Sequence, residues 1–429
     1  MRKFFFKIWT IYYFYYAMFF FKFYFKFLSL FTKKNIDKKN KSNTILYICA
    51  SCLPYHTTGY TVRTDQIFKA LQLYTNKKII VLTRPGYPWD RSDIEIKVHP
   101  KRKSTIYNNV TYQHFPYPRK QTRLLKYILQ SSDVILTKLL QTPVDYIVAG
   151  SNHMNALPGL IAAKKLNIPF IYEMRGLWEL SRISRQPDFK RSILYKQGLA
   201  LEQLTVKHSN KVTVISKQLS HYIQDQFEII PKKLQILPNC AHHQQLKKVK
   251  LSNHIVYAGS LIKYEGIDLL LKAAAVMKDK NFNYKLFIVG KGEESKNLKQ
   301  LSKNLNLQNN VFFLGHLSPK QTLSIINKCA MVCIPRKSYL VTKLVPPYKL
   351  IEAMRLKKTV VVPRLPVFLD MINHKQNGLL FAPNNYESLA NIIMTSLPNK
   401  QLLRMLGNNA HIYAKNHRSW KSHIRYLQI

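Results

Sequence analysis

Short apolar runs alternate with segments of helical periodicity in two successive rounds along this chain of 429 residues. The first round contains expected strands at Thr44–Ala50, Ile79–Leu82, Tyr146–Ala149, Phe170–Glu173 and Val212–Ile215. The second contains them at His254–Gly259, Lys285–Val289, Val311–Leu314, Met331–Ile334 and Thr359–Val362. Strands separated by helices indicate βαβ units with a mostly parallel sheet. We therefore expect an α/β protein with two doubly wound, Rossmann-like domains that face each other across a cleft.

The chain is predicted to divide into four segments. They are a basic, aromatic-rich N-terminal segment (1–42), a Rossmann-like domain (43–245), a second Rossmann-like domain (246–399) and basic C-terminal helices (400–429). We expect the last segment to pack back on the first domain. Doubly wound sheets bind ligands outside the carboxyl ends of their strands, so a site is expected between the two domains.

The net charge is strongly positive. Lysine and arginine number 67 against 21 aspartate and glutamate, which gives a formal charge of +46. This charge predicts an anionic neighbour: nucleic acid, an anionic membrane surface or phosphorylated small substrates. A coding bias toward Lys, Asn, Ile, Phe and Tyr is the alternative explanation. A nucleic-acid-binding protein is a competing hypothesis, but the chain has no recognisable module and its cations are spread out, so we expect no nucleic-acid partner.

Several other chemistries are poorly supported. Five cysteines in 429 residues exclude a disulfide scaffold. Cys49 and Cys52 form a C-x-x-C without the second pair that a zinc site needs, and Cys329 and Cys333 are expected in the core. The sequence contains no G-x-S-x-G, no G-x-x-x-x-G-K-[ST], no H-E-x-x-H and no D-x-D. We expect no metal site and no cofactor.

The N-terminal segment differs from the rest of the chain. Residues 4–31 contain seventeen aromatic side chains, and their longest charge-free run is Ile8–Phe21. That run is shorter than the roughly 20 residues that span a bilayer. Lys22 and Lys26 lie one helical turn apart, and more lysines follow. Aromatic and basic residues favour the membrane interface, so the segment is predicted to lie in that interface or to span with strain. A helix buried against the protein is the alternative.

One motif combines cations with a carboxylate at a helix start. Pro346 and Pro347 predict the start, because proline suits the first turn. Lys349 and Glu352 are three residues apart and share one helix face. The preceding strand ends in Pro335-Arg336-Lys337. Cations and amides suit a diphosphate and a carboxylate suits ribose hydroxyls, although an exposed ion pair would have the same spacing.

Two strand–loop–helix turns of the second round contain glycine. One runs from a strand that ends at Gly259 and Ser260 to a helix that starts at Gly266, and a similar loop begins at Gly290. Such turns approach phosphate closely, but ordinary loops between strands and helices also use glycine.

The first round contains two further candidates. Gly59 and Tyr60 precede a helix whose first turn contains Arg63, which we expect to face a cleft rather than water. Arg175 and Glu179 follow a strand and belong to a short loop with concentrated charge, in a chain where carboxylates are few.

Together these motifs resemble the GT-B glycosyltransferases of family 4 (group 1), particularly bacterial polysaccharide-assembling members. The resemblance covers Asn43 to the C-terminus and is carried by YEMRGLWE (172–179), YAGSLIKYEGID (257–268), PRK (335–337) and VTKLVPPYKLIEAM (341–354). It implies a GT-B fold and a retaining, metal-independent transfer of a sugar from a nucleotide-sugar donor to a glycan or lipid-linked acceptor, in cell-surface polysaccharide synthesis. With the N-terminal segment, it predicts an enzyme at the cytoplasmic face of the plasma membrane, peripheral or N-terminally anchored.

The resemblance also implies roles for individual residues. Glu352 matches the second glutamate of the family's pair, which holds the donor's ribose, and Lys349 matches a basic position beside it. The donor-phosphate loop is matched by Gly259, Ser260, Lys263, Glu265 and Gly266. Gly59 and Tyr60 match the glycine loop of the N-terminal domain, and Arg175 lies where many members place a site histidine or arginine.

The hard step is departure of the nucleoside diphosphate, which fixed cations would stabilise. Lys263, Arg336 and Lys349 are the candidates for this role, and Arg175 and Glu352 complete the candidate catalytic residues through the roles that the resemblance implies. The candidate substrate-binding residues are Gly59, Tyr60, Arg63, Glu179, Gly259, Ser260, Glu265, Gly266, Gly290, Lys337 and Lys343.

The sequence departs from the family at one position of the glutamate pair. Lys343 and Leu344 stand where the first glutamate, which addresses the transferred sugar, is usual. The departure leaves two alternatives open: another GT-B enzyme, such as a nucleotide-sugar epimerase, and a non-catalytic scaffold.

Overall fold

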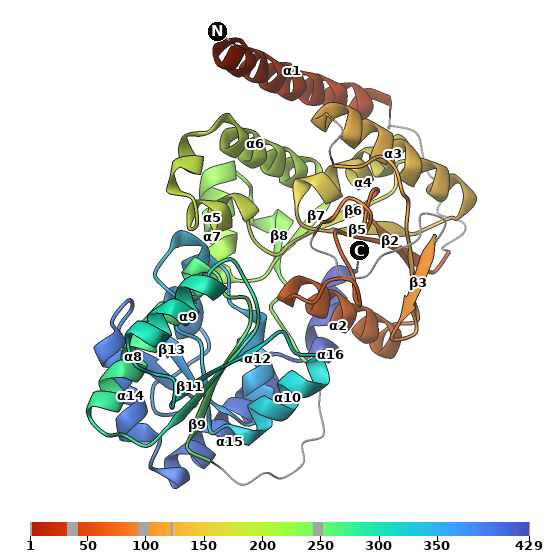
Figure 1. Ribbon diagram of the computed structural model, residues 1–429. Helices are drawn as coiled ribbons and strands as arrows, with labels where there is room; N and C mark the ends of the chain where they lie inside the picture. The colour runs from red at the N-terminus through yellow and green to blue at the C-terminus, as the bar shows by residue number, and fades with distance from the viewer. Residues whose placement is uncertain (1, 32–41, 93–102, 121–122, 243–251, 429) are drawn as a thin grey trace. The chain divides into compact units, whose positions relative to one another are not determined.

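The computed structural model describes residues 2–31, 42–92, 103–120, 123–242 and 252–428. Contacts divide the chain into two compact units, Met1–Leu237 with His423–Ile429 and Pro238–Ser422 (Figure 1). Each unit contains one sheet whose strands are mostly parallel, which confirms the predicted α/β class.

The first unit contains the N-terminal helix, a sheet and the helices that connect its strands. Its elements are α1 (Arg2–Phe31), β1 (Thr44–Cys49), α2 (Gly59–Tyr74), β2 (Lys78–Thr83), β3 (Ser104–Tyr107), β4 (Val110–Gln113), α3 (Leu124–Gln141), β5 (Tyr146–Gly150), α4 (His153–Lys165), β6 (Phe170–Met174), α5 (Trp178–Ile183), η1 (Pro187–Arg191), α6 (Ile193–His208), β7 (Lys211–Val214), α7 (Lys217–Phe227), η2 (Pro231–Lys233), β8 (Leu234–Ile236) and η4 (Ile424–Leu427).

The strands of this unit follow the order β3-β4-β2-β1-β5-β6-β7-β8. Every pair is parallel except β3 with β4. All six residues of β1, TILYIC, are buried, which is the reason for its continuous apolar run: a central parallel strand is covered on both faces. The hairpin of β3 and β4 was not predicted, because its short strands alternate buried and exposed residues at the sheet edge.

The second unit repeats the pattern with a six-stranded sheet in the order β11-β10-β9-β12-β13-β14. Its elements are β9 (His254–Ala258), η3 (Lys263–Glu265), α8 (Ile267–Asp279), β10 (Lys285–Val289), α9 (Ser295–Asn304), β11 (Val311–Gly315), α10 (Pro319–Lys328), β12 (Met331–Cys333), α11 (Leu340–Leu344), α12 (Tyr348–Arg355), β13 (Thr359–Pro363), α13 (Pro366–Leu369), β14 (Leu379–Phe381), α14 (Tyr386–Ser396) and α15 (Lys400–His417), and α16 (Trp420–His423) follows. All its strand pairs are parallel.

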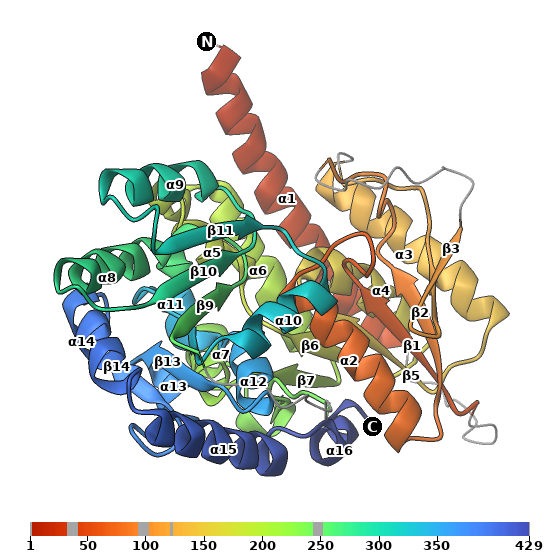
Figure 2. The ribbon, with the colours of Figure 1, turned by 60° about the horizontal axis from the view of Figure 1, so that its bottom comes forward.

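Successive residues of these strands point to opposite faces, and both faces are apolar. Ile255 and Tyr257 of β9 belong to a core with α8 and α14, whereas Val256 belongs to a core with α12. Figure 2 shows α8 and α14 on one side of this sheet and α12 on the other. Two separate cores around one sheet characterise a doubly wound domain.

The C-terminal segment differs from the expectation that all of it returns to the first domain. Leu403 and Leu406 of α15 lie in one core of the second unit and Ala410 and Ala414 in the other, so this helix stays with α12 and β13. The residues from His423 onward belong to the first unit, where η4 contacts α2. The apolar side chains of α15 pack into the cores of the second unit, whose sheet precedes this helix in the sequence.

Helix α1 buries one of its faces against the first unit. Ala17, Phe21 and Phe25 are at most 2% exposed, and the helix contacts α6 and α4. The Phe25 ring stacks on His208 with centroids 4.4 Å apart, and burial lowers the pKa of that histidine to about 4. The alternative expectation for the N-terminal segment, a helix buried against the protein, is therefore correct for this face of α1.

The other face of α1 is aromatic and uncovered. Its exposed large side chains are Tyr12, Tyr15, Tyr16, Phe19, Phe23 and Phe27, with the exposed Lys22 and Lys26 among them. Among the described residues, no helix combines the length and the apolar character that crossing a bilayer requires. We call these eight side chains the aromatic face of α1.

Candidate functional site

The strand order of the second unit reverses between β9 and β12. These two strands are neighbours although β10 and β11 lie between them in the sequence. Open α/β sheets bind ligands beyond the carboxyl ends of the strands at such a reversal. The predicted residues Gly259 and Ser260 follow β9, and Arg336 follows β12. The fold therefore brings two of the sequence motifs to one edge of the sheet.

The backbone of these loops is close-packed. The Gly259 N–H donates to the Val289 carbonyl (2.9 Å), and the Gly290 N–H donates to the Gly315 carbonyl (2.7 Å). Gly259 and Gly290 have φ of +154° and +137°, in the region that favours glycine. A β-carbon on Gly290 would overlap the Gly259 carbonyl. Glycine is thus required at Gly290 by the close approach of the two loops.

A buried ion cluster organises this edge around Glu265. Arg336 donates to Glu265 Oε1 from Nη2 (2.6 Å) and from Nε (3.1 Å). Lys349 Nζ donates to Glu265 Oε2 (2.8 Å) and to the Tyr257 hydroxyl (2.9 Å). We call Tyr257, Glu265, Arg336 and Lys349 the Glu265 cluster. Two cations share one carboxylate, so the cluster carries a net charge of about +1 and suits an anionic ligand.

The pKa values in the cluster reflect burial and pairing. Burial alone would raise the pKa of Glu265, but Arg336 and Lys349 outweigh it and hold that pKa at about 2. Burial lowers the pKa of Lys349, and Glu265 opposes this effect. The Lys349 side chain remains 17% exposed and that of Arg336 9%, so the ammonium is the more accessible cation.

Glu352 lies one turn after Lys349 on α12, whose N-cap is Pro347. Its carboxylate is half-buried and has no hydrogen-bond partner among the described residues. Burial raises its pKa to about 7, and Lys349 offsets part of this effect. Glu352 is therefore mostly protonated below about pH 7 and accepts hydrogen bonds as a carboxylate above it.

The remaining predicted residues of the second unit lie outside the Glu265 cluster. Lys263 and Ser260 are exposed, and the Ser260 carbonyl accepts from the Tyr257 hydroxyl (2.8 Å). Lys337 pairs with Asp268 (2.6 Å), and Lys343 is exposed on α11. Gly266 has a φ of +72° at the start of α8, where a β-carbon would overlap the Pro335 carbonyl.

In the first unit, Arg175 and Arg63 belong to a second buried ion cluster, around Glu173. Arg63 Nε lies 2.9 Å from Glu173 Oε1, and Arg175 Nη2 lies 2.7 Å from Glu173 Oε2. Tyr47 also donates to Glu173. Burial would raise the pKa of Glu173, but Arg175 and Arg63 hold it below its usual value.

These contacts give Arg175 and Arg63 an internal position. Arg175 donates to the Tyr60 carbonyl and to Thr64 Oγ1 (both 2.8 Å), and its guanidinium stacks on the Tyr60 ring. Arg63 is 2% exposed and donates to the Leu237 carbonyl (2.9 Å). Glu173 and the Leu237 carbonyl hold the Arg63 guanidinium in the interior of the first unit. Gly59 is exposed at the first turn of α2.

Glu179 lies in a third group that the motifs did not predict. It is fully buried, next to His153 and Glu202, whose Nδ1 and Oε1 lie 3.1 Å apart. Burial raises the pKa of Glu179 to about 9, Glu202 adds to this effect, and the nearby Trp178 indole opposes it. His153 and Glu202 are 49 residues apart, so no local spacing could have indicated the group.

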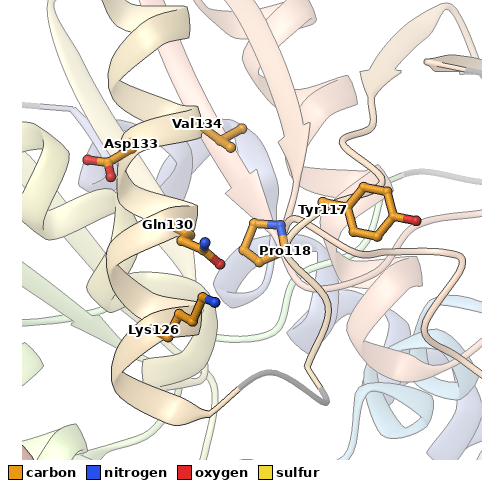
Figure 3. A pocket seen from close by; sticks show the side chains of 6 residues that line it. All are labelled: Tyr117, Pro118, Lys126, Gln130, Asp133 and Val134. Carbon is orange, nitrogen blue, oxygen red and sulfur yellow. The ribbon is translucent and has the colours of Figure 1, made fainter.

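A shallow cavity of about 430 Å³ lies beside α3. Lys126, Gln130, Asp133 and Val134 line it from α3, and Tyr117 and Pro118 line the opposite wall (Figure 3). Asp133 pairs with Lys165 (3.1 Å). The cavity contains none of the residues predicted from the sequence.

Comparison with known families places both units in glycosyltransferase families. Residues 85–245 match the family described as Glycosyltransferase Family 4, and residues 240–412 match Glycosyl transferases group 1.

Two curated relatives are similar at low identity. An uncharacterized glycosyltransferase of Methanocaldococcus jannaschii, MJ1178, is 24% identical over 332 residues, which cover 77% of this chain and 87% of the relative. The capsular polysaccharide biosynthesis glycosyltransferase CapM of Staphylococcus aureus is 23% identical over 291 residues, which cover 63% of this chain and 72% of CapM.

Solved structures share the fold. Sucrose-phosphate synthase from Thermosynechococcus elongatus aligns with a TM-score of 0.72 and 16% identity, over 90% of this chain and 97% of that one. HepE of Anabaena, solved with UDP and glucose, aligns with a TM-score of 0.65 and 17% identity, over 89% and 97% of the two chains.

Proposed function

Because the chain belongs to the GT-B glycosyltransferases of group 1 and family 4, we propose that it transfers a sugar from a nucleotide-sugar donor with retention of anomeric configuration. The donor is bound by the second unit and the acceptor, a glycan or a lipid-linked glycan, by the first. The transfer serves cell-surface polysaccharide synthesis. The relationship to CapM, a capsular polysaccharide biosynthesis enzyme, supports this last part.

The observation that carries the proposal is the position of Lys349 and Glu352 on one face of α12. Lys349 Nζ belongs to a cluster of net positive charge at the strand-order reversal, and Glu352 adds a carboxylate free of hydrogen bonds to described residues. A nucleoside diphosphate has the complementary pattern, with negative phosphates next to ribose hydroxyls that donate hydrogen bonds. HepE, which has the same fold, was solved with UDP, and this supports a diphosphate ligand.

We propose that protein cations, rather than a metal ion at the donor, stabilise the negative charge that develops on the departing diphosphate. Lys349 is the more accessible cation of the Glu265 cluster. The exposed Lys263, in the loop that follows β9, is the second candidate cation. Fixed cations act in the transition state without reorganising. Arg336 and Glu265 position Lys349 within the cluster. Retention follows if the acceptor hydroxyl attacks from the side on which the diphosphate leaves.

We place the protein at the cytoplasmic face of a membrane through the aromatic face of α1. Aromatic side chains favour the headgroup level, and the interspersed Lys22 and Lys26 suit anionic lipid. A membrane surface would bring the enzyme to a lipid-linked acceptor.

The proposal is tested by a donor screen on the full chain. Nucleotide sugars that raise the melting temperature are incubated with candidate acceptors, and the anomeric configuration of the product is determined by NMR. We expect a glycoside of retained configuration, formed equally well with and without added Mg²⁺. A sugar converted in the absence of any acceptor would indicate an epimerase instead, and a folded protein that binds no donor and no free nucleotide would refute the proposal.

A further inference from the structure

We propose that His153, Glu179 and Glu202 form a binding site for one divalent transition-metal ion inside the first unit, with Zn²⁺ as the ion that suits these ligands. The three residues come from three elements: His153 begins α4, Glu179 lies in α5 and Glu202 in α6. An ion held by all three would tie these helices together. Its role would be structural, because none of its ligands belongs to the Glu265 cluster assigned to the donor.

The spacing of the ligand atoms fits a metal site. His153 Nδ1 lies 3.1 Å from Glu202 Oε1 and 3.8 Å from Glu179 Oε1, and all three atoms lie within 4.8 Å of one another. Zn²⁺ binds imidazole nitrogen and carboxylate oxygen at about 2.0–2.2 Å, which separates tetrahedral ligand atoms by roughly 3.3–3.6 Å. Small side-chain adjustments would place an ion between these three atoms.

The burial of Glu179 and the lack of partners for its oxygens point independently to a cationic ligand. The residue is 0% exposed, and neither of its carboxylate oxygens has a hydrogen-bond partner in the described part of the chain. No described lysine or arginine pairs with Glu179 or Glu202. A fully buried carboxyl group without a hydrogen-bond partner is costly. A divalent cation in place of its proton would satisfy both of its oxygens and would also bind the neighbouring Glu202 carboxylate.

The neighbours of the group orient its ligands. The His153 backbone N–H donates to Glu202 Oε1 (2.8 Å), and the Tyr172 hydroxyl donates to Glu202 Oε2 (2.5 Å). Gly198 on α6 leaves room for the Glu179 carboxylate, since a β-carbon there would lie 2.9 Å from Glu179 Cγ and closer still to Oε1. Outer partners that fix the orientation of ligands are a regular feature of metal sites.

Metal analysis of the full-length protein tests the proposal. The protein is purified without chelator, and its zinc, manganese, iron, cobalt and nickel are measured by mass spectrometry. We expect one divalent ion per chain, a lower melting temperature after stripping with a strong chelator, and recovery on adding Zn²⁺ alone. Glu179→Gln and His153→Gln should each weaken Zn²⁺ binding more than about 100-fold, since losing an outer-shell partner alone costs 10–100-fold.

His221→Gln and Asp225→Asn are the matched controls, because both residues are exposed on α7. Both variants should bind Zn²⁺ like the unmodified chain. If the ligand variants fail to fold, Co²⁺ added to the stripped unmodified protein still decides the matter: Co²⁺ bound by these ligands should show visible absorption bands that differ from those of aqueous Co²⁺. The proposal is overturned if the folded protein contains no divalent metal and neither Zn²⁺ nor Co²⁺ changes its melting or its spectrum. It is equally overturned if Glu179→Gln binds Zn²⁺ unchanged.

Discussion

The Lys349 ammonium lies 2.8 Å from a carboxylate oxygen of Glu265, whose other oxygen binds Arg336. The three residues come from separate segments of the sequence and meet at the carboxyl ends of β9 and β12. Glu265 already holds the Lys349 ammonium in one orientation before a ligand arrives. The lysine side chain therefore loses little conformational freedom when a phosphate binds to it.

Lys349→Ala should lower kcat/KM for the nucleotide sugar by about 10²–10³, the typical effect of removing one group that stabilises transition-state charge. Lys299→Ala is the control, because Lys299 is exposed on α9 and is outside the Glu265 cluster. Steady-state kinetics on both variants provide the measurement. A Lys349→Ala enzyme within a few-fold of the unmodified one would show that the ammonium has no part in the reaction.

Gly259→Ala should disturb the same cation without removing it. A β-carbon at this position would overlap Lys349 Nζ, lie 2.9 Å from its Cε and force a φ of +154° on alanine. We expect donor binding to weaken strongly. Gly315→Ala has positive φ but open space around the new carbon, so it should cost only about 1–2 kcal/mol of stability. Calorimetric donor titration compares the two, and equal donor affinities would contradict the assignment.

Glu265→Gln should destabilise the second unit by about 3–5 kcal/mol, because it leaves two buried cations without their carboxylate. Asp268→Asn removes a partly exposed partner of Lys337 and should cost about 1 kcal/mol or less. Denaturant unfolding gives both values. The pKa of Glu265 is depressed to about 2, so its contribution is present above the ordinary value of 4.5 and is lost as pH falls through about 2. If the two variants have the same stability, the cluster does not support the fold.

Donor affinity should rise with pH through about 7 because of Glu352. Its pKa is raised to about 7, so the ionised carboxylate that accepts ribose hydroxyls predominates only above that value. Because its pKa is raised on folding, Glu352 also contributes to the free energy of unfolding. This contribution is fully present below pH 4.5 and is lost as the pH rises through about 7.

Glu352→Gln should abolish the pH-dependent step and weaken binding by about 1.5–3 kcal/mol, the value of a hydrogen bond to a charged group. The titration uses an intact nucleotide sugar, whose diphosphate diester does not change charge near neutral pH. A step of unchanged size in the variant would assign it to another group.

Replacing Phe19 and Phe23 by serine should reduce binding to anionic vesicles by about 10²-fold or more, since each buried Phe contributes roughly 1.5–3 kcal/mol. These residues are 72% and 64% exposed, so the fold should tolerate the change. Leu73→Ser on α2, which is 68% exposed, is the control. Substitution is preferable to deletion of α1, because Phe21 and Phe25 pack on the protein. Co-sedimentation that is unaltered by the double substitution would exclude this face as the membrane contact.

The predicted strands of both rounds correspond to β1, β2, β5, β6 and β7 and to β9–β13, with ends that differ by a residue or two. They were predictable because a strand buried on both faces requires a continuous apolar run, which is local information. The start of α12 after Pro347 was predictable for the same reason, since proline acts through its own ring. The short strands β3 and β4 were not, because their residues alternate between buried and more exposed positions and give no continuous apolar run.

Side-chain partners depend on contacts that no local pattern contains. Arg63 and Glu173 are 110 residues apart, and the ion cluster that keeps Arg63 buried exists only after β6 and α2 have packed. Glu265 was predicted as a member of a phosphate loop, yet both its oxygens are engaged by Arg336 and Lys349, so it orients cations.

The sequence by itself determined the two doubly wound sheets and the edge at which the glycine loops and the α12 motif meet, because periodicity and glycine or proline placement act over a few residues. Only the tertiary structure decided which charges are buried and paired, which face of α1 remains open, and that His153 and Glu202 join Glu179. The physical reason is that burial and Coulomb interaction depend on distance in space, and the chain sets those distances only when distant segments pack.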